Sequence, residues 1–217
     1  MLRYLGHRGQ SMDAVLQDLV EQCAVLCERE AVPRTVWRRL PVAADECAAT
    51  LTGTGVLLEG ADIARHLSGG EECIVMAATL GIGIDALVRR LQAVDLTRSV
   101  LVDSAASSLI EVVCDALETQ LRADLAREGR GLSHRFSPGY GDLPLTVQPD
   151  LIRLLDAPRR IGLHCNEGDL LLPRKSVTAL MAVLPSGACT GADESGQTKC
   201  ATCNLRDSCA YRVAKPG

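Results

Sequence analysis

The sequence predicts an α+β fold, with helices packed against a sheet. Three observations support this fold class. Residues 11–31 carry apolar side chains spaced by three and four, residues 73–80 are almost continuously apolar, and two apolar runs follow one another between residues 160 and 185. The N-terminal half is therefore predicted to be mostly helical, with the strands gathering toward residues 160–185.

The first elements follow from their start and stop signals. The helix over residues 11–31 begins behind a Ser/Asp start and is ended by Pro33. Residues 34–51 are a mixture of apolar and polar side chains that is predicted to begin a strand. Residues 54–67 predict a short strand, a turn at Gly60 and a second helix.

The central part of the chain alternates in the same way. The apolar run at residues 73–80 predicts a buried strand, and a helix is expected from about Ile84. Residues 96–129 form a long helical pattern that is weakly interrupted near Asp103. The segment that follows, residues 135–145, is rich in Gly and Pro and predicts an irregular loop.

The last predicted elements lie before a cysteine-rich tail. Residues 147–158 predict a short helix stopped by Pro158. Residues 160–165 and 177–185 are two candidate strands, which we expect to form a hairpin-like pair. We therefore expect one domain over residues 1–184 and a cysteine-rich tail over residues 185–217.

Composition excludes several classes of function. The 217 residues carry a formal net charge of −4, and no run of Lys and Arg forms a basic stripe, which argues against nucleic-acid binding. No apolar run is long enough to span a membrane, and the first residues lack the apolar centre of a signal peptide. We expect a cytoplasmic protein.

The ten cysteines fall into two groups. Six are scattered, mostly in apolar stretches, where buried thiols are expected: Cys23, Cys27, Cys47, Cys73, Cys114 and Cys165. The other four crowd into the tail, as Cys189, Cys200, Cys203 and Cys209. A C-x₂-C pair with further cysteines nearby favours metal over disulfides in a cytoplasmic chain. The uneven spacing favours an iron–sulfur cluster over zinc, with free or disulfide-linked thiols as the remaining alternative.

The stretch RFSPGYGD, residues 135–142, holds the only Phe and one of three Tyr. Pro138 followed by Gly139 predicts a type II turn with fixed backbone groups. The planar fork of Arg135 can bind a carboxylate, and the Tyr140 ring can face a planar or sulfonium ligand. Phe136 is the expected apolar anchor of the loop. An incidental surface turn remains the alternative.

Two glutamates and a pair of glycines can each be interpreted either as structural or as ligand-binding residues. Glu111 lies in an apolar part of the long helix and either faces solvent or contacts a ligand. Glu167 offers the same choice in a turn. Gly81 and Gly83 lie between a predicted strand and a helix, as in a dinucleotide fold, but Ala86 stands where the third glycine is expected. A plain strand–turn–helix connection is the preferred interpretation.

These blocks together resemble one known family. Arg135-x-x-Pro138-Gly139-Tyr140 is similar to the R-x-x-P-G-Y signature of the activation domain of vitamin B12-dependent methionine synthase, which binds S-adenosylmethionine. The LIEVVCDAL segment upstream and the NEGDLLLPRKSVTAL segment downstream extend the resemblance. Blocks near the N-terminus look like a stand-alone form of that domain, so most of residues 1–184 is covered.

The resemblance implies a fold and a binding site. It implies mixed helices with a mainly antiparallel sheet. It also implies that Arg135 takes the carboxylate of S-adenosylmethionine, that Phe136, Pro138, Gly139 and Tyr140 form the adjoining loop, and that Glu111 and Glu167 lie at the ligand. Glu128 is only an approximate counterpart of a further family Glu, and the family's additional C-terminal Tyr has no counterpart here.

The resemblance also implies a function. The chain would support reductive methylation of inactive cob(II)alamin on a partner corrinoid methyltransferase, methionine synthase in the first place, with an electron from a flavodoxin- or ferredoxin-type donor. Because cobalt is the nucleophile, no catalytic residue is expected, and the protein's contribution is positioning. The alternative is a non-catalytic module that binds corrinoid or S-adenosylmethionine and carries a structural zinc tail.

Overall fold

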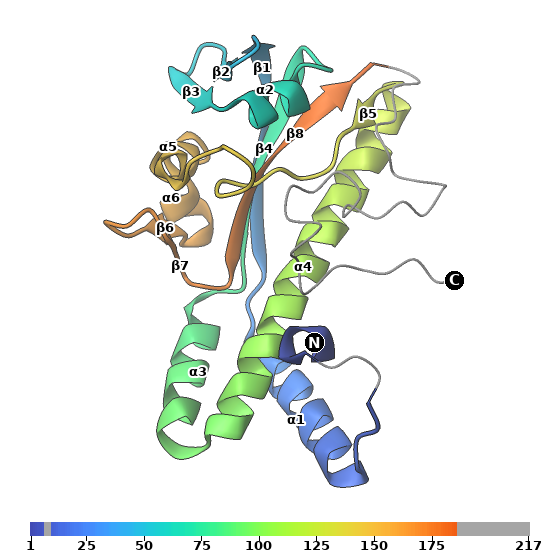
Figure 1. Ribbon diagram of the computed structural model, residues 1–217, viewed down its shortest axis with the longest axis vertical. Coiled ribbons are helices and arrows are strands. Elements are labelled where there is room, and N and C mark those ends of the chain that lie inside the picture. The colour runs from blue at the N-terminus through green and yellow to red at the C-terminus, as the bar shows by residue number, and fades with distance from the viewer. Residues whose placement is uncertain (7–9, 186–217) are drawn as a thin grey trace.

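The computed structural model describes residues 1–6 and 10–185, and its centre is an antiparallel sheet covered by helices (Figure 1). The strands follow the order β3-β2-β1-β4-β8-β5, and each pairs antiparallel with its neighbours. Their bounds are β1 Arg34–Ala44, β2 Ala48–Leu51, β3 Val56–Glu59, β4 Glu72–Thr79, β5 Gly131–Leu132 and β8 Ser176–Leu184. The predicted mainly antiparallel α+β fold is therefore confirmed.

The helices differ greatly in length. Their bounds are α1 Ala14–Glu30, α2 Ala61–Leu67, α3 Ile82–Val94, α4 Leu96–Arg127, α5 Gln148–Leu154 and α6 Ala157–Ile161. Two short 3₁₀ helices are η1 Leu2–Leu5 and η2 Leu145–Val147. A separate two-stranded sheet pairs β6 His164–Cys165 with β7 Leu171–Leu172. None of the helices in the part of the chain that the structure describes is long and apolar enough to cross a membrane.

The sheet separates two hydrophobic cores. One face carries side chains such as Val75 and Leu180 and packs against α2, α5 and α6. The opposite face carries Met76 and Met181 and packs against α1, α3 and α4. Because β4 is covered on both faces, almost all of its residues are buried, which explains the continuous apolar run at residues 73–80.

Local capping explains where the large helices begin. The Asp13 carboxylate accepts a hydrogen bond from the Leu16 N–H at 2.7 Å and starts α1. Asp95 caps α4 in the same way, through the Arg98 N–H at 2.9 Å. The weak interruption predicted near Asp103 is absent, since α4 runs unbroken for 32 residues. Asp103 instead faces outward and pairs with Lys175 at 2.9 Å.

The expected distribution of strands along the chain was wrong. Strands β1 to β4 all lie between residues 34 and 79, in the half predicted to be mostly helical, although individual strands were correctly predicted within residues 34–51, 54–67 and 73–80. The signal was weak because β1 is only partly buried. Its inward residues Val36, Leu40 and Val42 alternate with exposed, mainly charged or small residues over much of the strand.

The predicted pairing near the end of the domain was also wrong. Residues 160–165 do not pair with residues 177–185, because β8 lies between β4 and β5. Only His164–Cys165 of the first segment is a strand, and its partner is β7. Pro158 does not stop a helix but lies in the first turn of α6, where proline is tolerated because its missing N–H needs no partner.

The six scattered cysteines mostly follow the expected pattern. Cys23, Cys27, Cys73 and Cys114 are buried, and burial raises the pKa of the Cys73 and Cys114 thiols to about 12. The expectation was wrong for Cys47, which is exposed at the turn between β1 and β2. The four cysteines of the tail lie outside the described residues.

Candidate functional site

The segment after α4 is fixed to the sheet before it reaches the predicted loop. The Ser133 N–H donates to the Ala182 carbonyl at 2.9 Å, and Phe136 and Leu180 exchange two backbone hydrogen bonds of 2.9 and 2.8 Å. Phe136 packs against the core that includes Leu180. Side chains of an extended segment alternate between its two sides, so Arg135 points away from that core and toward α4.

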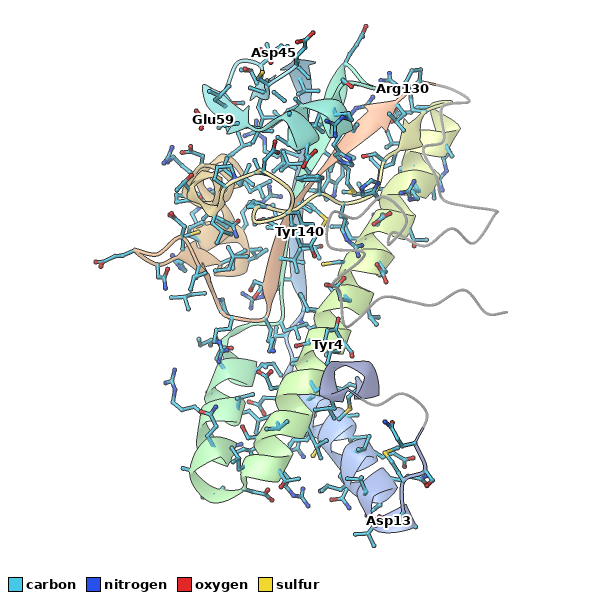
Figure 2. The ribbon with its side chains drawn as sticks, in the orientation of Figure 1. Tyr4, Asp13, Asp45, Glu59, Arg130 and Tyr140 are labelled. Atoms are coloured by element: carbon cyan, nitrogen blue, oxygen red, sulfur yellow. The ribbon has the colours of Figure 1, made fainter. Side chains whose placement is uncertain are left out.

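The predicted turn is present. The Tyr140 N–H donates to the Ser137 carbonyl at 3.0 Å, and Gly139 has a φ of 89°. A positive φ at the third residue is what a type II turn requires. Pro138 is buried, whereas the Tyr140 side chain is 62% exposed. Figure 2 shows Tyr140 on the segment that crosses the middle of the molecule.

The loop beyond the turn is tied to α2. The Asp142 carboxylate accepts hydrogen bonds from the Asp62 N–H at 3.1 and 3.2 Å. The Tyr140 and Phe136 rings meet edge to face, with centroids 6.5 Å apart, and the Phe136 ring lies 5.2 Å from the His66 ring. The exposed Tyr140 is therefore carried by a backbone that is held on two sides.

Arg135 lies in a cluster of carboxylates from α4. Its guanidinium contacts Asp115 at 2.6 Å, Glu118 at 2.9 Å and Glu111 at 3.2 Å, and its side chain is only 9% exposed. Burial lowers the pKa of the guanidinium, but the hydrogen bond to Asp115 and the charge of Glu118 more than offset this, so the pKa is raised. Arg135 is held in its charged state.

Glu111 was predicted at this position, but Asp115 and Glu118 were missed. Positions 111, 115 and 118 are spaced by four and three residues, so their side chains share one face of α4. That spacing was visible in the sequence and points to one acidic stripe. What the sequence did not reveal is that this stripe faces Arg135.

The other predicted or approximate site residues lie elsewhere. Glu167 is exposed in the turn between β6 and β7 and, within the described residues, shares no hydrogen bond or ion pair with Arg135. Glu128, the approximate family counterpart, binds Arg39 at 2.6 Å. The structure thus places Glu111 against the Arg135 guanidinium and keeps Phe136, Pro138, Gly139 and Tyr140 in the turn that follows Arg135 along the chain. It leaves Glu167 apart from that ion-pair cluster.

A histidine pair lies beneath the segment that carries Arg135. The His66 Nε2 is 3.0 Å from the Ser133 hydroxyl, which also accepts a hydrogen bond from the Ala182 N–H at 2.8 Å. The His66 and His134 rings meet edge to face at 4.6 Å. Burial, and then the charge of His134, lower the pKa of His66 to about 4. His66 is therefore neutral at pH 7 and supports the segment as a packed polar group.

The dinucleotide interpretation is excluded by the strand arrangement. Strand β4, which precedes Gly81, is antiparallel to both β1 and β8, whereas dinucleotide sites form on parallel strands. The absence of a side chain at Gly83 has a structural explanation, because a Cβ there would lie 3.1 Å from the carbonyl oxygen of Glu30. These glycines allow α3 to approach the end of α1.

Within residues 1–6 and 10–185, no group of three or more His, Cys, Asp or Glu side chains has metal-binding geometry. The predicted metal ligands Cys189, Cys200, Cys203 and Cys209 lie outside those residues. Two surface concavities of about 460 and 60 Å³ lie along α1 and α3, and none of the predicted site residues lines them. The candidate site is thus the Arg135 cluster with its adjoining turn.

The cluster suits a ligand that carries both signs of charge. Three carboxylates, Glu111, Asp115 and Glu118, face two guanidiniums, Arg135 and Arg122, which leaves a net charge of −1. Such a site can offer a guanidinium to a carboxylate and carboxylates to a cation. The residues therefore fit an amino acid that also bears a positive centre, as a sulfonium does.

The class defined by fold and site is an α+β protein whose long helix and following turn frame an arginine among carboxylates. The same fold occurs in the crystal structure of the MetH reactivation domain bound to AdoHcy. The TM-score is 0.64 at 18% sequence identity, over 85% of this chain and 72% of that one. The fold predicted from the resemblance is thereby confirmed. No model of a protein family matches the chain, and no curated protein matches it either.

Proposed function

We propose that the chain is an S-adenosylmethionine-binding reactivation protein for a partner corrinoid methyltransferase, methionine synthase in the first place. The observation that carries this proposal is the buried Arg135 beside the turn at Pro138, Gly139 and Tyr140. Its support is that the neighbour sharing the fold is a reactivation domain bound to AdoHcy, the product that S-adenosylmethionine leaves after methyl transfer.

The residues divide the ligand among them. Arg135 takes the α-carboxylate, because a guanidinium presents paired donors to a planar carboxylate. Glu111 accepts hydrogen bonds from the ammonium group or the ribose hydroxyls. The exposed face of Tyr140 lies beside the sulfonium, where a cation gains about 0.5–2 kcal/mol. Gly139 supplies the turn that keeps Tyr140 in place, and Phe136 and Pro138 anchor it. Glu167 lies apart from Arg135, so it would contact only a part of the ligand that extends beyond this turn.

S-adenosylmethionine supplies a methyl group: its S–CH₃ bond breaks, the sulfur keeps the electron pair as S-adenosylhomocysteine leaves, and the partner's cobalt, reduced from cob(II)alamin by one electron, forms the new bond. The protein needs no general base for this transfer, because no proton moves. Its residues would hold the sulfonium in line with the partner's cobalt, which is catalysis by positioning.

The tail belongs to the same proposal. Cys189, Cys200, Cys203 and Cys209 would hold an iron–sulfur cluster that passes an electron from a flavodoxin- or ferredoxin-type donor. Protein purified without oxygen should then contain iron and absorb visible light. Stoichiometric zinc and a colourless protein would instead make the tail structural.

The test uses the full chain with methionine synthase that lacks its own activation domain and is in the cob(II)alamin form. With titanium(III) citrate as reductant and S-adenosylmethionine labelled in its methyl group, the cob(II)alamin spectrum should disappear and label should reach the cobalamin. Omitting the chain should abolish the transfer of label, since titanium(III) citrate alone can reduce the cobalt but carries no methyl group. If S-adenosylmethionine binds but no label is transferred, the chain is a non-catalytic binding module. If it does not bind at all, the proposal fails.

A further inference from the structure

Glu118 lies between two arginines. Its Oε2 accepts a hydrogen bond from Arg135 Nη1 at 2.9 Å. Its Oε1 accepts hydrogen bonds from Arg122 at 2.7 Å from Nη2 and 3.1 Å from Nε. The Glu118 side chain is only 13% exposed. Both oxygens are therefore occupied by guanidiniums in a site that water reaches poorly.

Arg122 extends this arrangement to the backbone. Its guanidinium also donates to the carbonyl oxygens of Leu132 and Ser133, the second at 3.0 Å. Ser133 in turn pairs with Ala182 of β8. The same turn of α4 thus holds both the backbone that leads to Arg135 and one edge of the Arg135 side chain.

The other edge of Arg135 has a different environment. Nη2 contacts Asp115 at 2.6 Å and Glu111 at 3.2 Å, and these two side chains are 63% and 48% exposed. Ion pairs with exposed partners contribute little, whereas a buried pair is costly to break. An incoming carboxylate would therefore replace a partner at Nη2 and leave the bond at Nη1 intact.

We propose that Glu118 is the positioning residue of Arg135, and that Asp115 is the partner that the ligand's carboxylate displaces. The identity of that ligand rests on the proposed function above. The orientation of Arg135 by Glu118 does not, because it follows from the contacts of the protein alone.

A matched pair of variants separates these roles. Glu118→Gln and Asp115→Asn each remove one negative charge from a side chain that contacts Arg135. Isothermal titration would measure the affinity of each variant for S-adenosylmethionine and for its decarboxylated analogue. Glu118→Gln should weaken the binding of S-adenosylmethionine about tenfold, which is the lower end of what a residue supporting a ligating side chain contributes at metal sites. It should change the affinity for the analogue by no more than about twofold. Asp115→Asn should leave S-adenosylmethionine unchanged or bind it up to about fivefold tighter.

Three results would overturn the proposal. Equal losses in the two variants would mean that only the local charge matters. If Glu118→Gln loses as much affinity for the analogue as for S-adenosylmethionine, the site has changed shape. A loss beyond about fivefold in Asp115→Asn would mean that Asp115 holds the ligand rather than yielding to it. Glu118→Asp, which keeps the charge but shortens the reach, gives the same test if Glu118→Gln does not fold.

A ligand-free measurement keeps the two proposals distinguishable. In protein labelled with ¹⁵N-arginine, the Nη protons of Arg135 should give separate NMR signals because its guanidinium cannot rotate. These signals are assigned by their absence in Arg135→Lys. The signals should persist in Asp115→Asn and merge in Glu118→Gln. If wild-type protein shows them but binds no S-adenosylmethionine, the proposed function fails while Glu118 keeps its role. If they persist in Glu118→Gln, Glu118 does not position Arg135.

Discussion

Two arginine clusters in this molecule are alike in composition and differ in what surrounds them. In the first, Arg39 of β1 binds Glu72 of β4 at 2.7 Å and Glu128 at the end of α4 at 2.6 Å, and Arg130 approaches Glu72 at 3.5 Å. In the second, Arg135 binds three carboxylates of α4. Figure 2 labels Arg130 near the upper end of α4, away from Tyr140.

The difference shows why an ion-pair cluster is not by itself a binding site. The Arg39 cluster joins two arginines to two glutamates, so its charges balance, and it connects neighbouring strands to a helix end. The Arg135 cluster keeps one excess negative charge. It also adjoins a turn of fixed geometry that exposes a ring. Excess charge beside an ordered, exposed turn therefore distinguishes the Arg135 cluster, a candidate binding site, from the Arg39 cluster, which joins parts of the fold.

The largest expected effect separates the two arginines. Arg135→Ala should weaken S-adenosylmethionine binding by about 10- to 100-fold, because a hydrogen bond to a charged group contributes about 1.5–3 kcal/mol. Arg39→Ala should leave this affinity unchanged and lower the free energy of unfolding by about 1 kcal/mol, the upper end for partly exposed ion pairs. Isothermal titration and urea unfolding measure the two quantities. Comparable affinity losses in both variants would remove the distinction.

Acidification should affect the Arg135 side through His66. The pKa of His66 is lowered to about 4 in the folded protein, by burial first, against an ordinary value near 6.5. Between these values the unfolded chain binds more protons, so the free energy of unfolding falls as the pH falls. The loss should approach about 2 kcal/mol at pH 5 relative to pH 8.

Urea unfolding at the two pH values measures this loss. His66→Gln keeps a side chain that can share a hydrogen bond with the Ser133 hydroxyl but does not titrate, so most of the difference between pH 8 and pH 5 should disappear in that variant. The same pH dependence in both proteins would show that other groups control the acid response.

Local sequence signals predicted the turn after Arg135 better than they predicted the sheet. The turn at Pro138 and Gly139 follows from residue types that restrict φ, so it was predictable without tertiary contacts. The pairing of β8 with β4 and β5 was not, because it joins residues about a hundred and about fifty positions apart through matching apolar surfaces. Local turn chemistry and long-range pairing thus differ in how much one sequence reveals.

The partners of Arg135 fall between these cases. For Glu111 the residues alone left a solvent-facing and a ligand-facing position open, and the family resemblance favoured the second. The same helix face carries Asp115 and Glu118 by simple spacing. The orientation of that face depends on how α4 rotates against β8. Burial of Cys114, Leu117 and Leu121 fixes this rotation, and apolar periodicity could have indicated it.

A smaller effect compares Glu111, which the resemblance placed at the ligand, with Glu128, the approximate counterpart of a further family Glu. Glu111→Gln should weaken S-adenosylmethionine about tenfold, since it removes the charge that faces the ligand's cationic side. Glu128→Gln should not change the affinity, because Glu128 belongs to the Arg39 cluster. Titration of both variants decides the matter. An effect of Glu128→Gln comparable with that of Glu111→Gln would place the ligand nearer the end of α4.

The smallest expected effect compares two glycines with positive φ, one beside each cluster. Gly139 has a φ of 89° and Gly129, next to Glu128, a φ of 69°. Replacing either with Ala should cost about 1 kcal/mol, because side chains avoid this region, and should lower the Tm by about 2–4 °C.

Only Gly139→Ala should also change ligand binding. A Cβ at Gly139 would lie 3.3 Å from Leu145 Cδ2 and press on the turn that holds Tyr140, whereas a Cβ at Gly129 would have no neighbour within 4 Å among the described residues. The Tm of each variant with and without saturating S-adenosylmethionine separates the two effects. Ligand should raise the Tm of Gly129→Ala as much as that of wild type, and that of Gly139→Ala by less. Equal ligand-induced shifts would mean that the turn does not border the bound ligand, and the site would then be confined to Arg135 and α4.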